Sequence, residues 1–60
     1  MMNEYEVYTL AWRQQLQVWG KEYDMLQKLP DNKLTIARER KAKERLDWLS
    51  DRLRDLAAAM

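Results

Sequence analysis

The chain has 60 residues, with 11 basic and 10 acidic side chains and neither Cys nor His. This length allows one domain, residues 1–60, and the missing Cys and His exclude disulfides, Cys/His zinc sites and the commonest acid–base and thiol chemistries. We therefore expect a protein that is not an enzyme, with no catalytic residue, no cofactor and no metal site. The apolar runs are too short to cross a bilayer and the first residues lack a secretory pattern, so we expect a cytoplasmic protein without membrane contact.

Residues 3–28 carry the pattern of a first helix. Asn3 can cap this helix, and Glu6 follows at the spacing of a capping box. At about 100° per residue, aromatic and aliphatic side chains gather on one stripe, which we expect to form the core against a second helix. The members of this stripe are Tyr5, Tyr8, Trp12, Leu16, Trp19, Tyr23 and Leu26.

A second apolar stripe runs along the same segment, offset by about 100°. Its members are Val7, Ala11, Val18, Met25 and Leu29. Polar residues such as Gln15 and Glu22 lie between the two stripes. Because one neighbouring helix needs a narrower face, the second stripe predicts a further packing partner. Gly20, on the polar side, is either a tolerated surface glycine or a point of close helix approach.

Pro30 is the only Pro and lies at the midpoint of the chain. It pushes Leu29 out of helical geometry, and Asp31 or Asn32 can cap a second helix. The sequence therefore predicts an all-α fold, an antiparallel two-helix hairpin with helices over about 3–28 and 32–58.

The second helix carries a single seam with alternating spacings of four and three residues, as in a coiled coil. The seam consists of Thr35, Glu39, Ala42, Leu46, Leu49, Leu53, Leu56 and Met60. We expect Ala42, Leu46, Leu49, Leu53 and Leu56 to complete the intrachain core, with Trp19 opposite Ala42 and Trp12 opposite Leu49.

Trp48 lies off the seam, on the far flank of the second helix. Together with the second stripe of the first helix it forms an apolar surface that the hairpin cannot hide, and we assign this surface to an oligomer or partner interface. Residues 21–45 carry a net charge of +3 and the remainder −2. Two hairpins laid antiparallel would bring basic and acidic ends together, which favours a homodimeric four-helix bundle.

The start of the second helix is rich in basic residues that suit phosphate contacts. They are Arg38, Arg40, Lys41, Lys43 and Arg45. Interspersed glutamates and the near-neutral total charge make nucleic-acid binding the alternative rather than the first expectation.

The plan resembles that of small dimeric helical-hairpin proteins, such as the plasmid copy-number RNA-binding regulators, and more distantly that of sporulation-type hairpin phosphatases and kinase inhibitors. The resemblance is architectural, because Glu44-Arg45-Leu46-Asp47 lacks the Ser-Gln of the Ser-Gln-Glu-Leu-Asp signature of those phosphatases. We expect a small regulator or inhibitor, phage- or plasmid-borne, that binds another macromolecule through a homodimeric bundle. The alternative is an RNA- or DNA-binding hairpin dimer.

Overall fold

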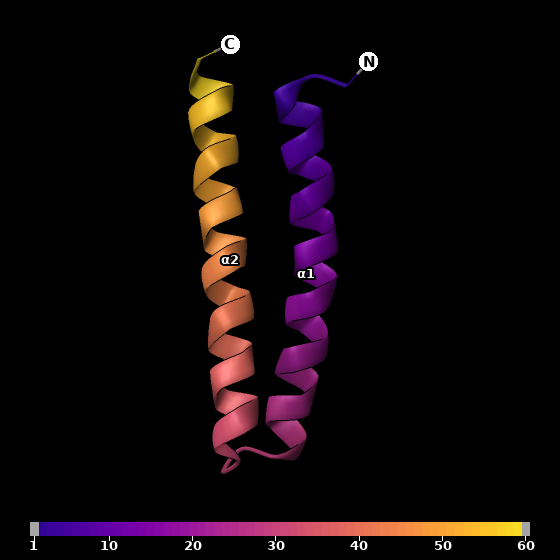
Figure 1. Cartoon of the computed structure of the whole chain (residues 1–60), viewed down its shortest axis with the longest axis vertical. Coiled ribbons are helices and arrows are strands. Elements are labelled where there is room, and N and C mark those ends of the chain that lie inside the picture. Colours follow the sequence, from indigo (N-terminus) through magenta and orange to yellow (C-terminus); the bar gives the residue numbers. More distant parts are fainter. Residues whose placement is uncertain (1, 60) are drawn as a thin grey trace.

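The computed structural model describes residues 2–59, which form two helices joined by a short turn. Helix α1 spans Glu4–Lys28 and helix α2 spans Lys33–Ala58. The helices lie side by side and antiparallel, with both chain ends at one end of the molecule and the turn at the other (Figure 1). The predicted all-α hairpin is confirmed, with helix bounds within one residue of expectation; Met60 of the predicted seam lies outside the described residues.

Both helices begin at an asparagine that caps free backbone N–H groups. The Asn3 Oδ1 accepts a hydrogen bond from the Glu6 backbone N–H at 2.9 Å. The Asn32 Oδ1 accepts from the backbone N–H groups of Leu34 and Thr35. Of the two residues that the sequence offered as the second cap, Asn32 is therefore the one used.

Polar contacts close the turn. Leu29 leaves helical geometry with φ of −130° and ψ of 64°, as expected before Pro30. The hydroxyl of buried Thr35 lies 2.7 Å from the Leu29 carbonyl oxygen and 2.8 Å from that of Asn32. The turn is thus held by a cap and a buried hydroxyl as well as by proline.

Helix α2 packs on α1 through the predicted seam. Ala42, Leu46 and Leu49 are buried, and Leu53 and Leu56 are half-buried. The side of α1 that faces them is half-buried and follows the same alternation of four and three residues. It consists of Tyr8, Trp12, Gln15, Trp19, Glu22 and Leu26.

The predicted α1 core is wrong at three positions. Leu16 and Tyr23 are 38% and 42% exposed, and Tyr5 is 37% exposed. The reason is that α2 lies toward one edge of the first stripe, over Tyr8, Trp12, Trp19 and Leu26, and also covers the polar line of Gln15 and Glu22. The other edge of the first stripe and the second stripe therefore flank the contact.

Hydrogen bonds satisfy the polar groups along this contact. The Trp12 indole donates to the Ser50 hydroxyl at 2.9 Å, and the Gln15 amide donates to the Ala42 carbonyl at 3.1 Å. The Trp19 indole donates to a carboxylate oxygen of Glu39 at 3.1 Å. Within residues 2–59, every buried side-chain polar atom has a partner. The Trp12 indole thus bonds to a residue one position from the expected Leu49, and the Trp19 indole bonds to Glu39, three positions from the expected Ala42.

The hairpin is a single layer of two helices. It measures 44 × 19 × 12 Å, and the shortest extent is about one helix diameter. Its radius of gyration is 13.8 Å, whereas a compact 60-residue domain has about 10 Å. Because two helices make only one layer, each broad face of the layer is open to solvent.

Over the part of the chain described, neither helix combines the length and apolarity needed to cross a lipid bilayer.

Replacing Thr35 with Val removes the turn hydroxyl while keeping the side-chain volume. Because the Leu29 carbonyl keeps its bond from the Asn32 backbone N–H, we expect a loss of about 1–2 kcal/mol rather than unfolding. Thr9→Val is the matched control, since the Thr9 hydroxyl only bonds back to the Tyr5 carbonyl within α1, and it should change stability by less than about 0.5 kcal/mol. Urea unfolding at one fixed protein concentration measures both; equal losses would contradict the assigned role of Thr35.

Replacing Gly20 with Ala decides between the two interpretations of that glycine. Apart from chain neighbours and the backbone of its own helix, no described atom lies within 4 Å of the Cβ position. We expect Gly20→Ala to raise the free energy of unfolding by about 0.5–1 kcal/mol with no change in self-association. If another helix instead approaches closely at Gly20, the variant will weaken self-association, which sedimentation equilibrium detects.

Candidate binding surfaces

One broad face of the hairpin displays Leu16 and neighbouring apolar side chains; we call it the Leu16 face. It also includes Tyr5, Tyr23 and Ile36, all exposed. Helical spacing places Leu16 and Tyr23 two turns apart on one side of α1. The Tyr23 ring lies 5.3 Å from the Trp19 ring, whose indole bonds to Glu39 of α2. The face therefore extends across both helices.

The opposite face displays the second apolar stripe, and we call it the Val18 face. Val7, Val18 and Met25 are 45–52% exposed there, and Ala11 is half-buried. These residues were predicted to form the oligomer or partner interface, and the hairpin leaves the large ones uncovered. Leu29 and Trp48, which complete that predicted set, are also exposed.

A groove runs between the helices on the Val18 face. Its apolar floor contains Val18 and Ala42, and polar side chains from both helices line its edges. The residues that line this Val18 groove are Gln15, Val18, Glu22, Arg38, Lys41, Ala42 and Arg45. Sequence reasoning missed that Gln15 and Glu22 face α2, although their spacing matches that of the α2 seam.

The two faces differ in charge balance, and the Leu16 face is the balanced one. Lys43 pairs with Asp47 at 2.7 Å and also lies over the Trp19 ring. Arg54 lies 3.9 Å from Asp51. Lys43 and Arg54 therefore each have an acidic neighbour in the same helix.

The Val18 groove carries excess positive charge. Three bases line it, against one carboxylate, Glu22, which lies 3.9 Å from the Arg38 guanidinium. The Arg38 side chain is 61% exposed, and Lys41 and Arg45 are exposed as well. A net charge of about +2 thus borders an apolar floor.

The hairpin divides the five bases that were predicted as nucleic-acid contacts. Arg38, Lys41 and Arg45 line the Val18 groove. Lys43 lies on the other side with Asp47, and Arg40, three residues before Lys43, shares that side by helical spacing. The bases therefore do not make one continuous patch.

An aromatic cluster extends the Val18 face toward the chain ends. The Tyr8 and Trp48 rings lie 6.0 Å apart, and the Arg52 guanidinium lies 5.7 Å from the Tyr8 ring. Trp48 is 54% exposed. The cluster adds a large apolar surface and a fourth base to this side of α2.

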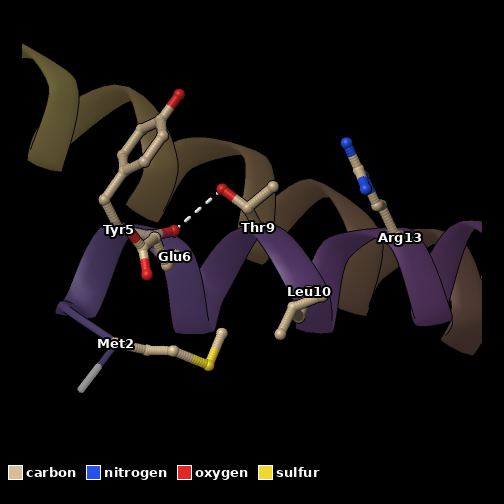
Figure 2. A pocket seen from close by; sticks show the side chains of 6 residues that line it. All are labelled: Met2, Tyr5, Glu6, Thr9, Leu10 and Arg13. Atoms are coloured by element: carbon tan, nitrogen blue, oxygen red, sulfur yellow. Dashed lines mark hydrogen bonds between the residues drawn. The ribbon is translucent and has the colours of Figure 1, made fainter.

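A second hollow lies on the outer side of α1, and Figure 2 shows its six lining residues. They are Met2, Tyr5, Glu6, Thr9, Leu10 and Arg13. All come from the start of the chain, and in the view Tyr5 and Thr9 point to one side of the helix and Met2 and Leu10 to the other. With one helix as its only wall, this hollow does not enclose a small molecule.

Among residues 2–59 no three carboxylates gather closely enough to hold a metal ion. The Ser50 hydroxyl accepts the Trp12 indole hydrogen bond instead of contacting a base. What the arrangement presents is two large surfaces of different charge, suited to macromolecular contact.

Comparison with protein-family models, with curated proteins and with solved structures finds no match to this chain.

Proposed function

We propose that the chain is a non-enzymatic, cytoplasmic binding protein that works as a homodimer, with two hairpins packed face to face as an antiparallel four-helix bundle. The observation that carries the proposal is the single layer, 12 Å thick. Folded domains bury apolar faces between at least two layers, and one hairpin supplies only one. A second hairpin is the simplest source of the missing layer.

The exposed area supports a second layer of this size. The hairpin exposes 5070 Å², whereas a monomeric protein of 7.3 kDa exposes about 4,200 Å². The excess of about 900 Å² is close to the roughly 800 Å² that each partner buries in a standard interface. One dimer contact would therefore bring the exposed area into the normal range.

The Leu16 face suits a second copy better than the Val18 face does. Its apolar residues are flanked by charges that are already paired within α2. Along α2, Lys43 lies nearer the turn and Asp51 nearer the chain end, so an antiparallel copy would place bases beside acids. Doubling the Val18 face would instead bring two basic grooves together.

Nucleic-acid binding is the second candidate, favoured by the three exposed bases of the Val18 groove. Phosphate contacts would make such binding strongly salt-dependent. The apolar floor between these bases is not explained by phosphate contact.

We expect the unmodified chain to sediment as a dimer, at twice 7.3 kDa, at micromolar concentration. Leu16→Glu places one carboxylate from each copy at the dimer contact and removes burial of Leu16 worth about 1.5–3 kcal/mol. The dissociation constant of the dimer should therefore rise by at least about tenfold. Because Leu16 lies outside the buried α2 seam, the hairpin itself should keep its helical circular dichroism at high concentration.

The matched control is Gln17→Glu, which adds the same charge one residue away, at an exposed position. It should leave the dissociation constant within about twofold. A monomeric unmodified chain at these concentrations, or equal effects of the two variants, would refute the Leu16-face dimer.

A further inference from the structure

The Val18 face, which contains the Val18 groove, has a regular construction along both helices. On α1, Ala11, Val18 and Met25 follow one another at intervals of seven residues. On α2, three arginines, Arg38, Arg45 and Arg52, do the same. Because seven residues are about two helical turns, each set forms a straight ridge along its helix. An apolar ridge and a basic ridge therefore run beside each other.

This construction fits a third helix. A helix with an apolar stripe presents contacts at the same two-turn interval, so it can meet Val18 and Met25 repeatedly along the groove. Both side chains are nearly half exposed and would gain from burial. A nucleic-acid backbone would use the arginines but leave the apolar ridge facing water.

The charge of the groove selects the chemistry of the occupant. Its single carboxylate, Glu22, is already close to Arg38 at 3.9 Å, so Lys41 and Arg45 have no acid among the residues that line the groove. A second copy would add the same net positive charge, which disfavours it as occupant. An occupant with carboxylates beside its apolar stripe would be complementary.

We infer that the Val18 groove binds an acidic amphipathic helix of a partner protein. The apolar stripe of that helix lies over Val18 and Ala42, and its Asp and Glu residues face Arg38, Lys41 and Arg45. This inference names the partner class for the binding function proposed above and rests on that function, but it does not require the Leu16-face dimer.

A synthetic peptide tests the inference directly. The probe is a fluorescein-labelled helical peptide of about 21 residues, six turns, with Leu at heptad a and d positions and Glu on both flanks. Its controls are a scrambled peptide of equal composition and the same heptad peptide with Lys in place of Glu. Titration with the full chain, followed by fluorescence anisotropy, should show saturable binding of the acidic heptad peptide at least tenfold tighter than either control.

Variants locate the site. Arg38→Gln with Arg45→Gln should weaken binding of the acidic peptide about tenfold, and Val18→Asn should weaken it severalfold. The control pair Arg13→Gln with Lys33→Gln removes the same charge outside the groove and should leave affinity within twofold. All variants should keep the helical circular dichroism and the sedimentation behaviour of the unmodified chain, because the replaced side chains are exposed.

Four results would overturn the inference. The first is that the scrambled peptide binds as tightly as the acidic heptad peptide, and the second is that the two double variants lose the same affinity. The third is tight binding of an RNA duplex of about 20 base pairs with no binding of the peptide. The fourth is loss of self-association in the groove variants. The last would make the groove the contact between two copies. If the chain dimerises through the Leu16 face but binds no peptide, only this inference fails; if it neither dimerises nor binds, the proposed function fails with it.

Discussion

The structure depends on where α2 lies on α1. It covers one edge of the first apolar stripe, which includes Trp12 and Trp19, together with the polar line that Gln15 and Glu22 mark between the two stripes. Hydrogen bonds to α2 accommodate polar groups in this contact: the Gln15 amide donates to the Ala42 carbonyl, and the Trp19 indole donates to Glu39. Because the contact uses the middle of a wide amphipathic face, apolar surface remains on both sides of the hairpin. The two open apolar faces are the direct consequence.

The same arrangement limits how stable one hairpin can be. Among the described residues, only Ala42, Leu46 and Leu49 are buried apolar side chains, which is little for a chain that must order 58 residues. Hydrogen bonds such as that from Trp12 to Ser50 contribute about 0.5–1.5 kcal/mol each to the free energy of unfolding. Their main effect is to fix the register of α2 on α1. We propose that further burial comes from outside the hairpin, at the two open faces.

Much of this fold could be predicted from the sequence, and the exceptions have physical reasons. The helix bounds, the Asn3 cap, the antiparallel turn and the α2 seam follow from local patterns, since α2 has one narrow row of leucines. The α1 contact follows only in part. Its aromatic residues, Trp12 and Trp19, come from the predicted stripe, but Gln15 and Glu22 do not, because a search for apolar periodicity gives no weight to polar residues and spreads the apolar ones over nearly half of the helix. The basic residues at the start of α2 lie on two different faces because of where α2 contacts α1, which the apolar pattern alone does not locate. Once the contact is centred correctly, Arg38 and Lys43 fall on opposite sides.

In the proposed dimer, a second copy of the chain completes the single layer of helices. Thermal unfolding of the unmodified chain over a hundredfold range of concentration tests it most directly, because only an associating protein has a concentration-dependent Tm. For a dimer of this size, with about 80 kcal/mol of unfolding enthalpy, the account predicts that Tm rises by about 10 °C over that range. A Tm that stays constant across the whole range would contradict it.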